Sequence, residues 1–300
     1  MTKRRIVIGC GGRANDDDAL ELGRRLCEAF EATPLVASCV LWPRYLLDEP
    51  ELGEAVEEDT KPILDRAVRR LAPLRAQTCS LYDDSAALAL QELAADVEPL
   101  MIVVGSAHRG RVGRVLLGST GLALTTGSPS PVAVAPRGYA DDEGDGLLRV
   151  GVAVDGGEES GPALDSAIAA AEHLHATLGI VGVLTPTPTG YGTLAGSAMG
   201  DLMRSQREHF ASVLEEAADR VPRDLPVRIV RFEGRPAMKI AEVSAEFDLL
   251  FVGSRGYGPL RRVLLGSVSS ELMRTVACPL VVTPKGVGAL DLAPSPVSSS

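Results

Sequence analysis

Glycine and serine residues at fixed spacing in the last third of the chain could bind a phosphate group. The pattern is Gly253-x-x-Gly256, nine further residues, and then Gly266-Ser267. Glycine lets the backbone approach a ligand closely, and a turn built from it can direct successive N–H groups into one concavity. A helix that starts behind such a turn adds the positive end of its dipole, and a serine at that start can cap the helix or donate to a phosphate oxygen. The pattern therefore predicts an anion site.

This segment occurs twice at a single offset. Val104-Gly105-Ser106 and Arg114-Val115-Leu116-Leu117-Gly118-Ser119 recur 148 residues later as Val252-Gly253-Ser254 and Arg262-Val263-Leu264-Leu265-Gly266-Ser267. One offset without a gap indicates two copies of one structural unit.

The second copy, between an apolar strand at 249–252 and a helix, resembles the motif of the universal stress protein family in its ATP-binding branch. The resemblance covers residues from about 4 to 284 as two tandem domains. It implies ATP as the ligand, with AMP as an alternative and Mg²⁺ accompanying ATP. It also implies a regulatory or sensor protein of the stress response, whose ligand changes loop order and hence the choice of protein partner.

The resemblance assigns ligand contacts in the second half of the chain. Asp155 follows a strand and would accept hydrogen bonds from ribose hydroxyls, Val183 would present its backbone to adenine, and Arg255 would neutralise phosphate charge. The phosphate-binding loop would contribute Gly253, Gly256, Gly266 and Ser267. Two alternatives stay open: Asp155 can be a strand-ending turn residue, and Val183 an ordinary buried strand residue.

The first half departs from this pattern at two positions. Gly11 stands in register with Asp155, and His108 stands in register with Gly256. Loss of the carboxylate removes a ribose partner, and a histidine side chain obstructs close approach to the backbone, although contact between His108 and phosphate is an alternative. We expect weak or no nucleotide binding here. The equivalent site residues are Gly11, Val40, Gly105, His108, Gly118 and Ser119.

The residue types argue against a dedicated enzyme. No lysine occurs between Lys61 and Lys239, so neither loop holds the lysine typical of phosphate-transfer loops. The arginines of the two glycine loops could neutralise phosphate charge, but most are expected to be solvated or paired with the other half of the chain. They are Arg109, Arg111, Arg114, Arg255, Arg261 and Arg262. We expect weak ATP hydrolysis at most. A slow ATPase or nucleotidyl-transferring enzyme and a nucleotide-free interaction scaffold are the alternatives.

Composition excludes several partners. The net charge of −10 and the pI of about 5.0 argue against binding to nucleic acid or anionic membranes. No apolar stretch approaches the roughly 20 residues of a transmembrane helix. The five cysteines form neither a Cys-x-x-Cys pair nor a zinc pattern, so most are expected to be buried apolar residues. A cytoplasmic location and no metal site are expected.

Strand and helix patterns alternate in both halves. Strands are expected at 5–9, 35–41, 78–82, 100–104 and 131–135, and near 148, 178, 227, 248 and 279. Helices are expected at 17–32, around 63–71, at 85–97, after Gly118 and at 201–221. The pattern predicts two tandem flavodoxin-like or Rossmann-like doubly wound domains, each a five-stranded parallel sheet with helices on both faces. Ligands of such sheets bind beyond the carboxyl ends of the first and fourth strands.

Domain boundaries follow from the same patterns. We expect domains at 1–138 and 147–284, an exposed linker at 136–146, and a disordered tail at 285–300. The region 185–200 is expected to be a flexible surface loop, with a lid as the alternative. The resemblance implies pairing of the last strands, at 131–135 and 279–283, as an intramolecular pseudo-dimer, with a homodimer as a further expectation.

Overall fold

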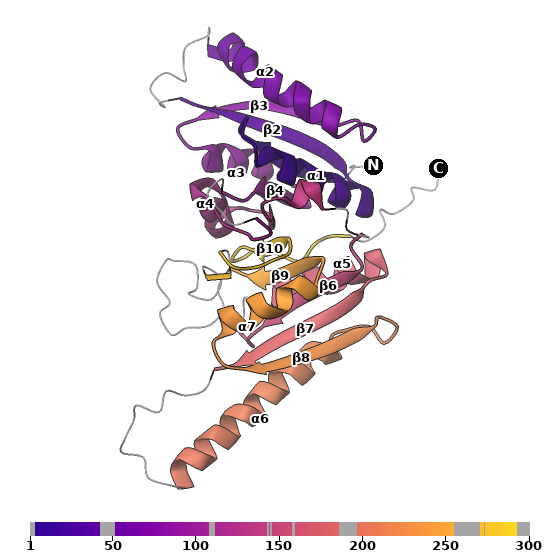
Figure 1. The fold of residues 1–300 in the computed structure, drawn as a ribbon, viewed down its shortest axis with the longest axis vertical. Coiled ribbons are helices and arrows are strands. Elements are labelled where there is room, and N and C mark those ends of the chain that lie inside the picture. Colours follow the sequence, from indigo (N-terminus) through magenta and orange to yellow (C-terminus); the bar gives the residue numbers. More distant parts are fainter. Residues whose placement is uncertain are drawn as a thin grey trace.

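The computed structural model describes residues 4–42, 52–107, 112–142, 144, 146–157, 160–185, 197–254, 271–272 and 274–292. The described chain forms two α/β domains that follow one another along the longest axis of the molecule (Figure 1).

The first domain alternates strands and helices in the predicted order. Its elements are β1 (Arg5–Cys10), α1 (Asp16–Ala29), β2 (Thr33–Leu41), α2 (Leu52–Arg70), β3 (Gln77–Asp83), α3 (Ala86–Val97), β4 (Met101–Gly105), α4 (Ser119–Gly127) and β5 (Val132–Ala135). A short 3-10 helix, η2 (Tyr139–Asp141), follows.

The second domain repeats this order. Its elements are β6 (Arg149–Val154), α5 (Ser160–Leu174), β7 (Thr177–Leu184), α6 (Ser197–Asp219), β8 (Val227–Glu233), α7 (Pro236–Val243), the 3-10 helix η3 (Ser244–Glu246), β9 (Leu249–Gly253) and β10 (Leu280–Thr283). Glu271 and Leu272 are also helical.

The ten strands of the described residues form one sheet in the order β3-β2-β1-β4-β5-β10-β9-β6-β7-β8. Each half is parallel, as predicted, but β5 and β10 are antiparallel, with Ala133 opposite Val281. The sheet as a whole is therefore mixed. The last strands of the two domains pair within the chain, as the resemblance implied.

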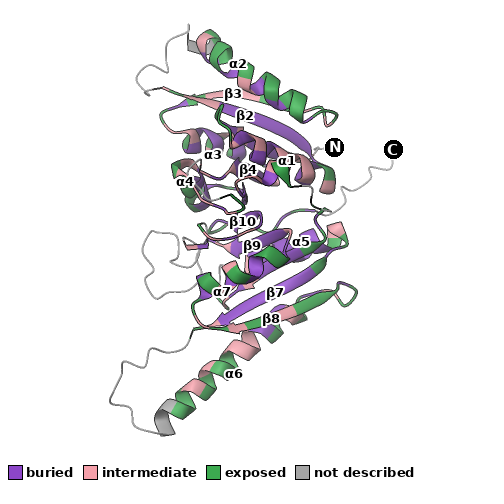
Figure 2. Cartoon of the chain, in the orientation of Figure 1, coloured by how far each residue is buried: buried purple, intermediate pink, exposed green. Residues whose placement is uncertain are grey.

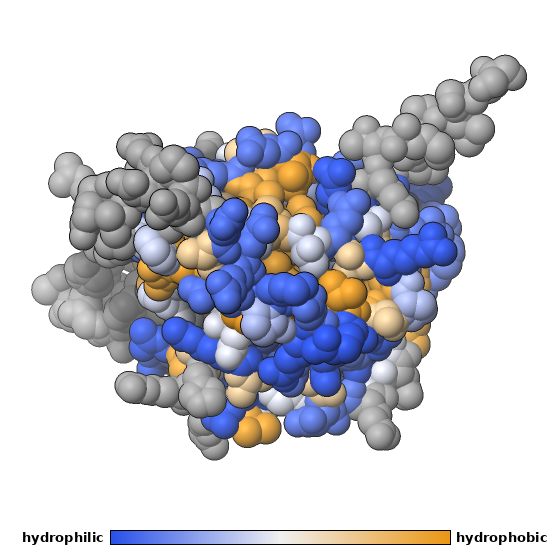
Figure 3. Space-filling view, turned by 90° about the horizontal axis from the view of Figure 1, so that it is seen from above, coloured by the Kyte–Doolittle hydropathy of each residue, from blue (hydrophilic) through white to orange (hydrophobic). Residues whose placement is uncertain are grey.

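Apolar runs place the central strands inside the sheet. Every described residue of β5 and β10 is buried, and helices cover both faces (Figure 2). The two faces carry separate apolar cores, and each core contains residues of both domains. The end of the molecule seen from above in Figure 3 is mostly hydrophilic, with small apolar patches.

The segment between the domains is not the exposed linker that its composition suggested. Asp18 of α1 is buried, and its carboxylate accepts hydrogen bonds from the backbone N–H groups of Gly138 and Ala140, both at 2.9 Å. The guanidinium of Arg25 lies 4.8 Å from the centre of the Tyr139 ring. Contacts with α1 therefore hold the first part of this segment on the first domain.

The expected disordered tail is wrong for residues 285–292. Leu290 and Leu292 are buried in the core, and the backbone N–H of Leu290 donates to Ser166 Oγ at 3.1 Å. Apolar burial outweighs the glycine and proline content of this stretch. Residues 293–300 lie outside the described part of the chain.

Helix α6 begins at Ser197 rather than at residue 201, so the loop expectation is wrong for 197–200. Residues 186–196 lie outside the described residues. The first half of α6 extends past the sheet, and most of its side chains are exposed or half-buried (Figures 1 and 2).

Candidate functional site

The carboxyl ends of the first and fourth strands of each domain lie side by side, as predicted. In the second domain β6 lies between β7 and β9, and Val152 pairs with Phe251. Asp155 directly follows β6, and Gly253 ends β9. These two residues therefore meet at the same edge of the sheet, at the point where strand order reverses, which is where such sheets bind ligands.

Asp155 organises the turn between β6 and α5. Its Oδ1 accepts hydrogen bonds from the Gly157 N–H at 2.9 Å and from Ser160 Oγ at 2.7 Å. Gly156 takes a positive φ of 77° within this turn. The turn role that the sequence left open is therefore present in the structure. It stabilises the start of α5 and fixes the direction of the carboxylate.

The side chain of Val183 is a core residue. It is 1% exposed and packs in one of the two apolar clusters, opposite Phe232 of β8. The alternative of a buried strand valine therefore holds for the side chain. The predicted contact of its backbone with adenine stays a prediction.

The described part of the second loop consists of its first residues. The backbone N–H of Ser254 donates to Thr283 O at 2.9 Å, which joins the end of β9 to the end of β10. The other predicted residues of this loop, Arg255, Gly256, Gly266 and Ser267, lie outside the described residues, as does His108 of the first loop.

In the first domain, a carboxylate near the end of β1 comes from Asp16, at the start of α1, and not from the residue that follows the strand. Gly11 follows β1 as Asp155 follows β6, and Asp16 begins α1 as Ser160 begins α5. The Asp16 carboxylate accepts hydrogen bonds from the backbone N–H groups of Gly11 at 3.1 Å and of Arg13 at 3.0 Å. Burial raises the pKa of Asp16, and these N–H groups offset part of that rise. The Asp16 carboxylate thus occupies N–H groups of the loop between β1 and α1.

Asn15 contacts the end of β4 at the crevice between β1 and β4. A Cβ atom on Gly105 would lie 2.3 Å from the Asn15 carbonyl oxygen, which shows how closely the two backbones approach. The Asn15 Nδ2 group also donates to Ser106 O at 2.9 Å. Sequence reasoning missed Asn15 and Asp16. Their only signal was an Asn-Asp start of a helix, which is typical of capping residues.

In the first domain, the loop after β4 is held by hydrogen bonds within the loop and to the end of β5. Ser106 Oγ donates to Ala135 O at 2.7 Å and accepts from the Leu116 N–H at 3.1 Å, while the Ala107 N–H donates to Leu116 O. Helix α4 begins at Ser119, as predicted, but its N-cap residue is Gly118, which has no side chain to cap the helix. The N–H groups of Ala107 and Leu116 are therefore occupied by partners within the loop.

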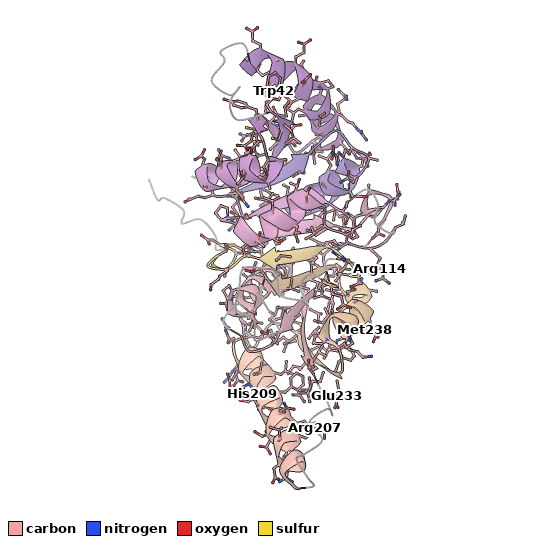
Figure 4. The ribbon with its side chains drawn as sticks, turned by 90° about the vertical axis from the view of Figure 1, so that its left-hand side faces the viewer. Trp42, Arg114, Arg207, His209, Glu233 and Met238 are labelled. Atoms are coloured by element: carbon pink, nitrogen blue, oxygen red, sulfur yellow. The ribbon has the colours of Figure 1, made fainter. Side chains whose placement is uncertain are left out.

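The structure also places two further candidate residues of the first domain, Val40 and Arg114. Val40 is half-buried and pairs with Tyr82 of β3. Arg114 does not point to an anion site of its own domain: its Nη1 donates to Thr275 O of the second domain at 2.9 Å. Figure 4 shows Arg114 at the junction of the domains, beside β10. The expectation of arginine paired with the other half is confirmed for this residue.

Two open hollows lie away from the switch points. One, of about 630 Å³, lies between α1 and the 142–147 segment, and the other, of about 510 Å³, lies along α6 between Gly200 and Ala211. In both hollows the arginines form ion pairs with neighbouring carboxylates, such as Arg24 with Glu28 and Arg207 with Glu233.

The cysteines offer no reactive thiol. Three of the five are buried, two are half-buried, and all five are free. Burial raises the pKa of each thiol, for Cys27 to about 12, so the thiols stay protonated at neutral pH. Within the described ranges, no cluster of His, Cys, Asp or Glu could hold a metal ion. No described helix is long and apolar enough to cross a membrane.

Strand order and register define a tandem pair of Rossmann-like α/β domains joined through their last strands. The chain belongs to the universal stress protein family, which matches residues 3–136 and 147–284.

Several known proteins are similar to this chain. A universal stress protein of Mycobacterium tuberculosis is 34% identical over 188 residues, which cover 62% of each chain, so the match spans less than two thirds of that relative. The crystal structure of a universal stress protein from Archaeoglobus fulgidus has the same fold, with a TM-score of 0.67, 19% identity, and coverage of 94% of this chain and 98% of that one. A universal stress protein solved in complex with cAMP covers 46% of this chain and 97% of its own, with 24% identity and a TM-score of 0.34.

Proposed function

We propose that this universal stress protein binds one adenine nucleotide per chain, in its second domain, and acts as a regulatory or sensor protein. The observation that carries the proposal is the difference between the two switch points. In the first, Asn15 packs against Gly105 and donates to Ser106 O, and the Asp16 carboxylate accepts from the N–H groups of Gly11 and Arg13. In the second, a carboxylate stands at the strand end, beside the start of the glycine loop.

Each group has a role in this proposal. Asp155 accepts hydrogen bonds from the ribose hydroxyls, and the backbone of Val183 contacts adenine. The loop of Gly253, Arg255, Gly256, Gly266 and Ser267 holds the phosphates through N–H groups and a helix start. The ligand is ATP with Mg²⁺, or AMP. The binding domain comprises residues 147–284, and the first domain comprises residues 1–138.

The proposed protein is a switch and not a dedicated catalyst. The loop lacks a lysine, and efficient phosphoryl transfer needs positioned cations and a group that orients the nucleophile. Nucleotide occupancy then changes the surface that a regulatory protein partner meets. Five free cysteines favour a reducing compartment, so we assign the protein to the cytoplasm.

The test is the identity of the nucleotide that copurifies with the protein. Protein purified without added nucleotide and then denatured should release ATP or AMP, which anion-exchange chromatography identifies. Release of guanine nucleotide would contradict the adenine assignment. If nothing is released and added ATP does not bind, the protein is a nucleotide-free scaffold. Phosphate release with Mg²⁺ on the order of 1 per second would favour an enzyme.

A further inference from the structure

The sheet has two edge strands, and they differ in how they are protected. Among the described residues, β3 pairs only with β2 and β8 pairs only with β7, so each strand leaves one side of its backbone open. The two edges lie at opposite ends of the sheet (Figure 1). An open edge presents N–H and C=O groups to any other strand, and proteins commonly protect it with charged side chains.

The edge strand of the second domain, β8, is protected in this way. Three of its seven residues are charged, namely Arg228, Arg231 and Glu233. Arg228 forms an ion pair with Glu246, and Glu233 forms one with Arg207 at 3.6 Å. A strand added at this edge would therefore meet charges of both signs that already have partners.

The edge strand of the first domain, β3, lacks charges along most of its length. Its first six residues, from Gln77 to Tyr82, are uncharged and include neither proline nor glycine. Asp83 ends the strand and is buried. Gln77, Thr78 and Tyr82 are exposed, and 44% of the Tyr82 side chain is open to solvent. This edge can therefore accept another strand.

The two faces of β3 differ in polarity. Ser80 Oγ and Thr60 Oγ1 of α2 share a hydrogen bond of 2.7 Å, so the even-numbered residues of the strand face α2. Cys79 and Leu81 are half-buried on the opposite face, against the apolar cluster to which α3 contributes. A strand added at this edge would extend a polar and aromatic face on one side and an apolar face on the other.

A second copy of the chain fits this edge because β3 is complementary to itself. A two-fold axis perpendicular to the sheet relates two antiparallel strands and maps each face onto itself, so one residue lies opposite its own copy. With Ser80 in that position, Thr78 lies opposite Tyr82 of the second copy, and Cys79 lies opposite Leu81. Pairs of a β-branched with an aromatic side chain stabilise antiparallel sheets, and the apolar pair extends the buried face.

The charges at the ends of the strand are compatible with the same register. Gln77 of each copy lies opposite Asp83 of the other, so no like charges face each other. Arg75 is exposed and lies two residues before Gln77, within diagonal reach of the same carboxylate. An axis at Leu81 would instead place Asp83 opposite Cys79 and leave the carboxylate against an apolar face. The register about Ser80 is therefore the favoured one.

We infer that β3 is a homodimerisation edge, at which a second copy of this chain adds its own β3 in antiparallel register about Ser80. The sheet then runs continuously through both copies. The contact is closed, because each copy uses its β3 edge for the other, and the assembly stops at two chains. The charged β8 edges stay at the outer ends. This inference is independent of nucleotide binding.

The experiment measures the mass of the full chain by sedimentation equilibrium over a range of concentrations, together with amide hydrogen exchange in β3. The unchanged protein should shift with rising concentration from the chain mass of 31.5 kDa to twice that mass. Exchange of amides within residues 77–83 should slow over the same range, because the added strand supplies hydrogen-bond acceptors at the open edge.

Variants at one exposed position test the register. Gln77→Glu places like charges opposite each other at both ends of the paired strands and should weaken the dimer about tenfold, whereas Gln77→Lys places opposite charges there and should strengthen it. Val227→Glu is the matched control, since Val227 is exposed and begins the other edge strand, β8. It should leave dimerisation unchanged.

Several outcomes would overturn the inference. One is a chain that stays a monomer at every concentration. Another is slow exchange in β3 that does not depend on concentration, because another part of the same chain would then cover the edge. A dimer that Gln77→Glu and Gln77→Lys affect equally, or that Val227→Glu weakens as much, would place the interface elsewhere. Masses above two chains would indicate open assembly and contradict the closed dimer.

Discussion

The carbonyl oxygen of Asn15 lies over Gly105, so close that a Cβ atom at residue 105 would be 2.3 Å from it. The first turn of α1 therefore closes on the end of β4. In a doubly wound domain this gap between the first and fourth strands is the ligand-binding crevice. In the first domain, the chain itself thus approaches this gap closely.

Gly105→Ala should destabilise the protein. The added methyl group must displace backbone and not a flexible side chain, so the expected cost is about 1 to 3 kcal/mol of unfolding free energy. Gly11→Ala is the matched control, because nothing lies within 4 Å of a Cβ atom at that position. Urea denaturation measures both. Equal midpoints for the two variants would show that Asn15 does not pack against Gly105.

Asp155→Ala should lower both nucleotide affinity and stability. Loss of a charged acceptor for the ribose should cost about 1.5 to 3 kcal/mol of binding free energy. Loss of the acceptor for Gly157 N–H and Ser160 Oγ should cost about 1 kcal/mol of unfolding free energy. Asp155→Asn keeps the turn acceptor but not the charge, so it should retain more stability than affinity. Calorimetry and thermal melting separate the effects, and unchanged ATP affinity in Asp155→Ala would leave Asp155 as a turn residue only.

Asp16→Asn should change how stability depends on pH. Burial raises the folded-state pKa of Asp16 above its ordinary value of 3.8. The folded protein therefore binds this proton more tightly than the unfolded chain, and the associated stability is present at low pH and is lost as pH rises through the raised pKa. Asn keeps an oxygen acceptor for Gly11 and Arg13 but does not ionise. The unfolding free energy of Asp16→Asn relative to the unchanged protein should rise between acidic and neutral pH; a difference independent of pH would contradict the assignment.

Sequence patterns predicted the alternation of strands and helices, because apolar strands and a repeat of one offset can be read from the sequence. The adjacent positions of Asp155 and Gly253 followed from the rule for doubly wound sheets. The sequence patterns did not predict the contact of Asn15, since it joins the residue before α1 to the residue after β4, 91 residues away in the chain. The burial of Tyr139 and Leu290 was also missed. Composition marked both segments as exposed, and the contacts that bury them are tertiary.

Calorimetric titration of ATP into the full chain measures how many nucleotides the two domains bind. We expect one nucleotide per chain. Gly256→His, which copies His108 of the first domain, should abolish most of this binding while the circular dichroism spectrum stays unchanged, because the imidazole blocks the backbone N–H groups. His108→Gly should not add a second site, since Asn15 still contacts the end of β4 and Asp16 still occupies the Gly11 N–H. Two equivalent sites in the unchanged protein, or full ATP affinity in Gly256→His, would contradict a single site in the second domain.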